Sequence, residues 1–175
     1  MAEFTGRKLR TYPSEFGFST ALLVTELPEV ADLGREIVRR IDLRGVCKLD
    51  FKRGDDGGLR LLEVNPRFNL WHHPAALAGV NLPALVHADL TGRPRPAAVS
   101  RPTRDASWTW LAKDARAAHA SGPSVRRWVR FAVSSSAKSP FAWDDPMPMV
   151  RGVLLPAIGR RVASIGRLKP AHAGA

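Results

Sequence analysis

The chain has 175 residues, a mass of 19.2 kDa and 45% hydrophobic residues, which is enough for one folded domain with its own core. Its 27 Lys and Arg residues exceed its 16 Asp and Glu residues, giving a formal net charge of +11. That charge alone favours a nucleic-acid-binding protein. However, residues 1–92 hold 12 basic and 12 acidic side chains, so the whole excess lies in residues 93–175.

The cysteine content and the hydropathy pattern argue against a disulfide-bonded, a secreted and a membrane-spanning protein. The single Cys47 excludes a disulfide framework, and the first residues lack the apolar stretch of a secretory signal. The longest uncharged run, residues 68–88, is long enough to cross a membrane but contains Asn, His and Pro. We therefore predict a cytoplasmic protein without a membrane span.

The predicted elements begin with a polar, basic segment at 1–15 and an apolar, β-branched strand at 18–25. Apolar residues then recur at helical spacing from Pro28, and Gly45 is the expected stop. Two runs around the sequence RGDDGG predict a β-hairpin with Asp56-Gly57 at its tip. The remaining predictions are helices at 73–78, 82–90, near 106–120 and 124–133, and an amphipathic pattern at 149–168. A Pro-rich linker at 93–105 divides the chain into regions 1–92 and 106–175.

The predicted hairpin places two carboxylates opposite each other. A two-residue turn pairs Asp50 with Glu63 and Lys48 with Asn65, and alternation puts these four side chains and Arg67 on one face. Like charges directly across a strand pair are destabilising unless a cation lies between them. Two carboxylates and an amide oxygen are hard ligands of the kind that Mg²⁺ prefers. Lys48 and Arg67 could then hold phosphate oxygens.

The opposite face of the hairpin is apolar and consists of Cys47, Leu49, Phe51, Leu62 and Val64. Cys47 is accordingly expected to pack as a small hydrophobic residue. The alternative for the polar face is an ordinary solvated surface, on which Lys48 and Lys52 neutralise the acids. A different turn length would also shift the register and exchange the two faces.

The segments KLDF and LLEVNPRF, joined by a short hairpin, resemble the metal-binding hairpin of the ATP-grasp superfamily. The resemblance covers about residues 3–92 and implies that Asp50, Glu63 and Asn65 are Mg²⁺ ligands. It also implies catalytic positions for Lys48 and Arg67, which would face the phosphates or an acyl-phosphate intermediate.

Further cofactor contacts are also implied by resemblance. The residue before the Glu of the motif, here Leu62, would lie against the adenine of ATP. The segment FTGRKLRTYPSEFGFST resembles the strand and loop that carry basic phosphate contacts in some members, which makes Lys8 and Arg10 candidate ATP-binding residues.

The resemblance implies an α+β fold: a C-terminal ATP-grasp subdomain, with an antiparallel sheet flanked by helices, followed by a basic, mainly helical tail. Its function would be the Mg-ATP-binding part of a ligase that activates a carboxylate as an acyl phosphate for attack by an amine or similar nucleophile. The expected partners are a small-molecule carboxylate and an amine, not nucleic acid. The glycine-rich loop of the family's N-terminal half is not found in this sequence, so we expect the chain to need that half for catalysis.

The basic second half supports an alternative function from a different class. Arg126, Arg127 and Arg130 surround Trp128, and the 149–168 pattern combines apolar and Arg residues. Such surfaces bind RNA, an anionic membrane or a partner protein. In this alternative the chain is a basic binding module with a relic hairpin, and peripheral membrane contact by the C-terminal helix stays open. A core helix with a solvated basic face explains the same pattern.

Overall fold

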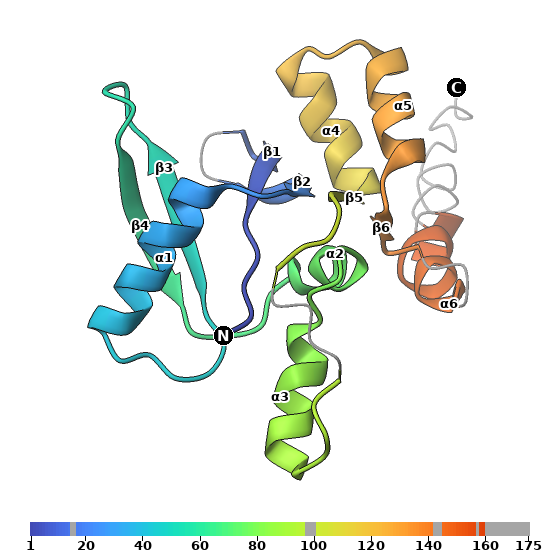
Figure 1. Cartoon of the computed structure of the whole chain (residues 1–175). Coiled ribbons are helices and arrows are strands. Elements are labelled where there is room, and N and C mark those ends of the chain that lie inside the picture. The colour runs from blue at the N-terminus through green and yellow to red at the C-terminus, as the bar shows by residue number, and fades with distance from the viewer. Residues whose placement is uncertain (15–16, 97–100, 142–144, 157, 160–175) are drawn as a thin grey trace, which may run out of the picture.

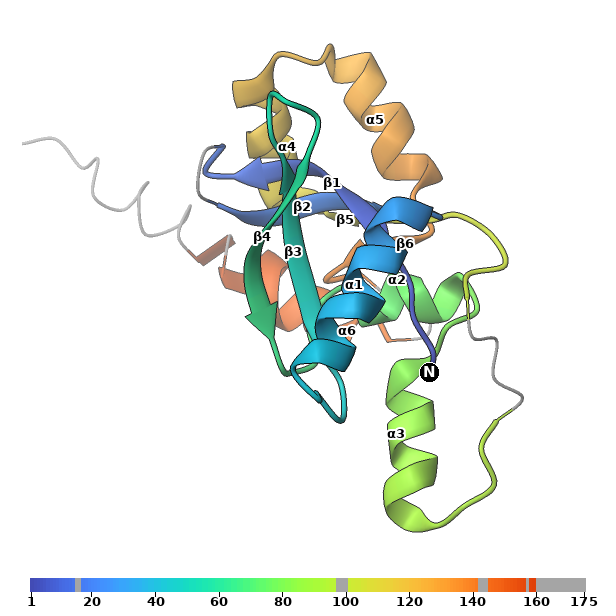
Figure 2. The same cartoon turned by 60° about the vertical axis from the view of Figure 1, so that its left-hand side comes forward.

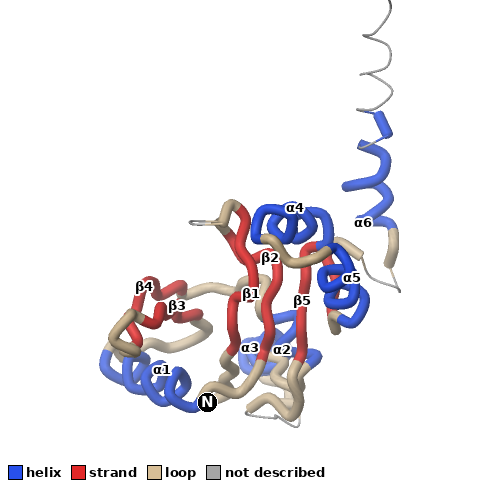
Figure 3. Tube along the Cα trace, turned by 90° about the horizontal axis from the view of Figure 1, so that it is seen from above, coloured by secondary structure: helices blue, strands red, loops and turns tan. Residues whose placement is uncertain are grey.

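The computed structural model describes residues 1–14, 17–96, 101–141, 145–156 and 158–159. The fold is α+β, as predicted, and contains a four-stranded sheet flanked by helices and a separate two-stranded hairpin. Figure 1 shows the hairpin and helix α1 (Pro28–Arg40) on one side of the molecule and the sheet with its helices on the other. The view from above in Figure 3 shows the same separation.

The four-stranded sheet has the strand order β1-β2-β5-β6. β1 pairs antiparallel with β2, β2 antiparallel with β5, and β5 parallel with β6, so the sheet is mixed. Its strands are β1 (Gly6–Tyr12), β2 (Phe18–Val24), β5 (Ala106–Trp110) and β6 (Ala137–Ser139). Because β2 and β5 come from either side of residues 93–105, the predicted division of the chain there does not coincide with a boundary of the sheet.

The hairpin consists of β3 (Lys48–Arg53) and β4 (Leu59–Asn65), and α1 packs against it (Figure 2). Pro28 lies at the first turn of α1, where its fixed φ and missing N–H are tolerated. A Cβ atom on Gly34 would lie 3.4 Å from Cδ1 of Leu49, so the helix contacts the predicted apolar face of the hairpin.

Some of the remaining helices flank the four-stranded sheet, whereas α3 extends away from it (Figure 1). In Figures 1 and 2, α4 and α5 lie on one side of it and α2 on the other. These helices are α2 (His72–Leu77), α3 (Leu82–Thr91), α4 (Leu111–Ser121), α5 (Val125–Ser134), α6 (Met147–Met149) and a π-helical turn, Val150–Leu154. α3 and α4 end at Gly92 and Gly122, whose positive φ angles of 63° and 80° suit glycine.

The main hydrophobic core lies between the sheet and α2. Its largest fully buried member is Trp108 of β5, which is 1% exposed and donates a hydrogen bond from Nε1 to Oγ of Ser139 at 3.0 Å. The buried residues packed with it are Leu22, Val24, Trp71, Ala78, Ala106 and Ala137. The hairpin contributes no residue to this cluster, so the sheet and its helices are stabilised without it.

The structure corrects one predicted element. Residues 106–110 form a strand and the helix begins only at Leu111, because the segment ASWTW pairs with β2 and β6 and buries Ala106, Trp108 and Thr109. The predicted 149–168 helix is described only up to residue 159, and its remainder lies outside the described residues. No helix in the described part of the chain is long and apolar enough to cross a membrane.

Candidate functional site

The hairpin has the predicted pairing at its base although its tip differs from the prediction. Asp50 lies opposite Glu63 and Lys48 opposite Asn65. The tip is longer than a two-residue turn, since the N–H of Gly54 donates to the carbonyl of Gly58 at 2.8 Å. The extra residue at the tip is offset by an irregularity between Asp50 and Phe51, where β4 contains one residue more than β3. This β-bulge restores the register that brings the two carboxylates together.

Asp50 lies between two lysines. Its Oδ2 accepts a hydrogen bond from Nζ of Lys48 at 2.5 Å, and its Oδ1 forms an ion pair with Nζ of Lys8 at 3.2 Å. The Asp50 side chain is 12% exposed. Burial alone would raise the pKa of Asp50, but the hydrogen bond and charge of Lys48 and the charge of Lys8 outweigh it and hold the pKa below its ordinary value. Asp50 is therefore an anion at neutral pH.

The other predicted metal and phosphate residues lie on or beside the same hairpin. Glu63 is exposed, and no ion pair of Glu63 is found in the part of the chain that the structure describes. Asn65 is half-buried, and its carbonyl accepts the N–H of Arg67 at 2.9 Å, which begins the turn after β4. The exposed Arg67 guanidinium contacts the carbonyl of Phe68 at 3.5 Å. Both side chains, Glu63 and Arg67, are thus open to a ligand.

The predicted ATP-binding residues have three different surroundings. Lys8 joins the hairpin through Asp50, as described. The guanidinium of Arg10 instead binds Asp114 of α4 in bidentate fashion, with Nε and Nη2 at 2.8 and 2.7 Å from the carboxylate oxygens. Leu62 is 63% exposed and belongs to the bulged part of β4, where the strict alternation used to place it fails.

Trp71 is a core residue that also lies beside the candidate site, and the sequence did not single it out. Its ring centroid lies 5.8 Å from Nζ of Lys48, within cation–π range, and the side chain is 9% exposed. The ring also approaches β1 so closely that a Cβ atom on Gly6 would lie 2.6 Å from its Cζ3. The only sequence signal is a large aromatic residue shortly after NPRF, and aromatic residues are more often part of a core.

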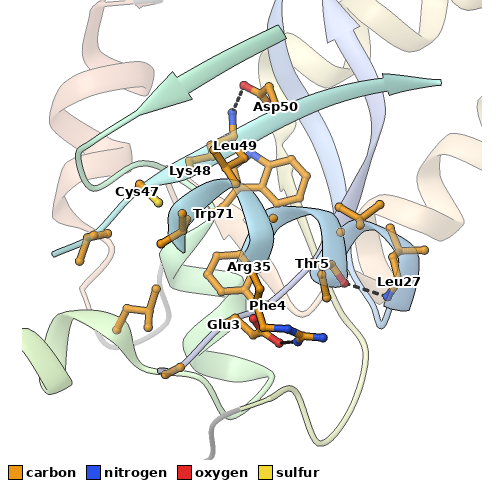
Figure 4. Close-up of a pocket in the computed structure, with 18 of the residues that line it drawn as sticks. Glu3, Phe4, Thr5, Leu27, Arg35, Cys47, Lys48, Leu49, Asp50 and Trp71 are labelled. Carbon is orange, nitrogen blue, oxygen red and sulfur yellow. Dashed lines mark hydrogen bonds and ion pairs between the residues drawn. The ribbon is translucent and has the colours of Figure 1, made fainter. Parts of the chain in front are cut away.

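A cavity of about 1150 Å³ is lined by Lys8, Lys48, Asp50 and Trp71, whereas Glu63, Asn65 and Arg67 are not among its lining residues. It is lined by parts of β1, α1, β3 and α3 and by Trp71. Figure 4 shows Asp50 and Lys48 at one end of the pocket, with Trp71 beside Lys48, and the pair of Glu3 and Arg35 at the other end. The cavity thus combines the Asp50 carboxylate, the two lysines that bind it and apolar walls.

The donor set at the hairpin fits a hard divalent cation. Asp50 and Glu63 are directly opposite, which places their Cβ atoms about 4.5–5.5 Å apart, and Asn65 lies two pairs further along the ladder. Within the described residues, no group of three His, Cys, Asp or Glu side chains gathers, and the hairpin offers two carboxylates and an amide oxygen. Mg²⁺ commonly binds to one or two carboxylates and completes its octahedron with water and phosphates.

A family model of ATP-grasp proteins matches residues 18–114, which is more than half of the chain. The chain is therefore an ATP-grasp protein. Within that class, it belongs to the family described as ATP-grasp in the biosynthetic pathway with Ter operon. Neither the curated proteins nor the solved structures contain a match to this chain.

Membership of this family indicates a nucleotide-binding protein with ATP-dependent, ligase-like function. The matched region includes all of α1 and the hairpin and extends through β5 to the first turn of α4. It therefore contains Asp50, Glu63 and Asn65, whereas Lys8 and Arg10 precede it. ATP and Mg²⁺ are the ligands that the family generally uses.

Proposed function

We propose that the polar face of the hairpin binds Mg-ATP and that the protein takes part in activating a carboxylate as an acyl phosphate. The observation that supports this best is the pairing of Asp50 with Glu63 across the hairpin, with Lys8 and Lys48 beside Asp50. Asp50 and the two lysines also line a cavity that is large enough for a nucleotide. A surface selected only for stability would not place two carboxylates directly opposite each other.

Each residue has a distinct part in this proposal. Asp50, Glu63 and Asn65 would hold Mg²⁺, which when bound neutralises charge on the phosphates. Lys8 and Lys48 would bind non-bridging phosphate oxygens, and Trp71 keeps the Lys48 ammonium over its ring until they do. Arg67 has the planar, bidentate geometry that suits a phosphate or acyl phosphate.

The proposed reaction belongs to the substrates, and the protein contributes positioning and charge. An oxygen of the substrate carboxylate attacks the γ-phosphorus of ATP, the bond to the bridging oxygen breaks, and ADP leaves. An amine or similar nucleophile then attacks the carbonyl carbon of the acyl phosphate. Inorganic phosphate leaves with the electron pair, and the nitrogen loses its proton to solvent. Positive side chains near the phosphates stabilise the charge that accumulates in the first step.

The test is a titration of the ¹⁵N-labelled chain with Mg-ATP, followed by NMR. We expect shifts in β3 and β4, and a loss of affinity of about tenfold or more in Asp50→Ala and Glu63→Ala, because each removes a metal ligand. Asp56→Ala is the matched control, since it removes a carboxylate from the exposed tip of the same hairpin, where Asp56 binds Arg60 at 2.9 Å. An unchanged affinity in the two site variants, or no binding by the wild-type chain, would contradict the proposal.

A second candidate function rests on the surface of α5. Arg126, Arg127 and Arg130 are exposed, no acidic residue lies in the helix, and Val125 and Val133 are 77% and 73% exposed. An exposed basic and apolar helix face is typical of contact with an anionic lipid surface. Salt-sensitive binding to phosphatidylserine vesicles, lost when the three arginines become glutamines, would support this function. Indifference to the lipid charge would exclude it.

A further inference from the structure

Both carboxylate oxygens of Asp50 are already engaged by lysines. Lys48 lies two residues away on the same strand and binds Oδ2, while Lys8 comes from β1 and binds Oδ1. The side chains of Lys48 and Asp50 are 21% and 12% exposed, so this cluster is partly shielded from water. A cation that binds Asp50 therefore meets an ammonium group beside each carboxylate oxygen.

Lys8 is also a link between the two sheets. β1 is an edge strand of the four-stranded sheet, and β3 belongs to the separate hairpin. A register shift follows Lys8 in β1, where Leu9 is passed over in the pairing with β2. Bulges of this kind redirect side chains at sheet edges. The ion pair of Lys8 with Asp50 thus depends on local backbone geometry and holds the hairpin against the sheet.

The charge of an incoming ligand determines whether it can draw Lys8 and Lys48 away from Asp50. A divalent cation that arrives alone meets two ammonium groups beside the carboxylate that should bind it, and the repulsion weakens its binding. A polyphosphate that arrives first attracts both lysines and draws them away from Asp50. The Asp50 carboxylate then lies beside the bound phosphates and opposite Glu63. This concentration of negative charge favours the binding of a cation.

We propose that Asp50 is a masked metal ligand, which Lys8 and Lys48 release only when the nucleotide phosphates bind them. Divalent cation and nucleotide therefore bind cooperatively, and the cation alone binds weakly. This inference rests on the proposed Mg-ATP function of the hairpin. Because binding linkage is reciprocal, the cation raises the affinity for nucleotide by the same factor.

The experiment uses Mn²⁺ as a paramagnetic probe and follows the broadening of amide signals in β3 and β4 of the full chain. Mn²⁺ is titrated with and without a non-hydrolysable ATP analogue, in wild type and Lys8→Met. We expect broadening around Asp50 at much lower Mn²⁺ concentration when the analogue is present. In Lys8→Met, Mn²⁺ alone should bind about fivefold more tightly, because one opposing charge is removed.

Lys52→Met is the matched control. Lys52 lies two residues beyond Asp50 on the same strand, and within the described chain no ion pair of Lys52 is found. This variant removes the same charge from a lysine that does not pair with Asp50, and it should change Mn²⁺ binding much less than Lys8→Met does. Lys8→Gln serves as a second variant, since the Lys8 side chain is 41% exposed and its replacement leaves the core intact.

Three results would overturn the inference. Equal Mn²⁺ affinity with and without the analogue would show that nucleotide does not unmask Asp50. Unchanged or weaker Mn²⁺ binding in Lys8→Met would show that Lys8 does not oppose the cation. If Mn²⁺ never broadens the hairpin, even with the analogue, the Mg-ATP function fails together with the inference, whereas the first two results leave that function intact.

Discussion

Replacing Asp114 should destabilise the fold more than replacing any exposed acid. Asp114 is 0% exposed and accepts hydrogen bonds from Arg10, from Oγ1 of Thr20 at 2.9 Å and from Nε1 of Trp128 at 3.0 Å. It thereby joins β1, β2 and α5 to α4. Asp114→Ala leaves the Arg10 guanidinium, which is only 17% exposed, without its counter-charge. Removing one partner of a buried ion pair costs about 3–5 kcal/mol, and the partial exposure of Arg10 favours the lower end, about 3 kcal/mol.

Urea unfolding followed by tryptophan fluorescence measures this loss, since Trp128 contacts Asp114 directly. Asp89→Ala is the matched control, because Asp89 binds Arg95 with similar bidentate geometry at an exposed position. We expect it to change stability far less than Asp114→Ala does. The double variant Arg10→Met, Asp114→Ala should be more stable than Asp114→Ala alone, because the unpaired charge is gone. A loss below about 1 kcal/mol in Asp114→Ala would refute the reasoning.

Three further predictions concern the hairpin. The pKa of Asp50, measured by carboxyl NMR, should lie below its ordinary value and should rise in Lys48→Met. The ion pairs of Asp50 stabilise the fold at pH values above the unfolded-state pKa, and this stabilisation is lost as the pH falls through the folded-state pKa. Burial raises the pKa of the Cys47 thiol, so iodoacetamide should react more slowly with the folded chain at neutral pH than with the urea-unfolded chain; equal rates would contradict this. Gly57→Ala should cost about 1 kcal/mol in urea unfolding, because Gly57 has a φ of 79°, whereas Gly58→Ala, with no positive φ, should cost less.

The hairpin shows how a correct prediction of strand pairing can rest on a wrong turn. A two-residue turn at Asp56-Gly57 gave the pairing of Asp50 with Glu63, and the structure has that pairing. The actual tip closes between Gly54 and Gly58, which alone would shift the register by one residue. The bulge in β4 reverses the shift. A bulge depends on packing and strain across the whole strand pair, so periodicity in the sequence does not reveal it.

Contacts between distant segments could not be predicted in the same way. Helix α1 followed from its apolar spacing and from Pro28, which are local signals. The ion pairs of Lys8 with Asp50 and of Arg10 with Asp114 join residues far apart in the sequence. The resemblance that selected Lys8 and Arg10 treated them alike, yet only Lys8 reaches the hairpin. A role of Arg10 in ATP binding stays a prediction, and its observed contacts are structural.

The uneven distribution of charge along the chain is consistent with two separate electrostatic roles, one at the hairpin and one in residues 93–175. At the hairpin, Lys8 and Lys48 are balanced by Asp50 and Glu63, so the site is close to neutral before any ligand binds. A strongly basic site would hold polyphosphate without a cation, and a strongly acidic one would hold the cation without polyphosphate. A balanced site favours the two together, which is the requirement for chemistry on Mg-ATP. The basic excess of residues 93–175 is therefore not needed for this task, and its exposed arginines on α5 are available for a different contact.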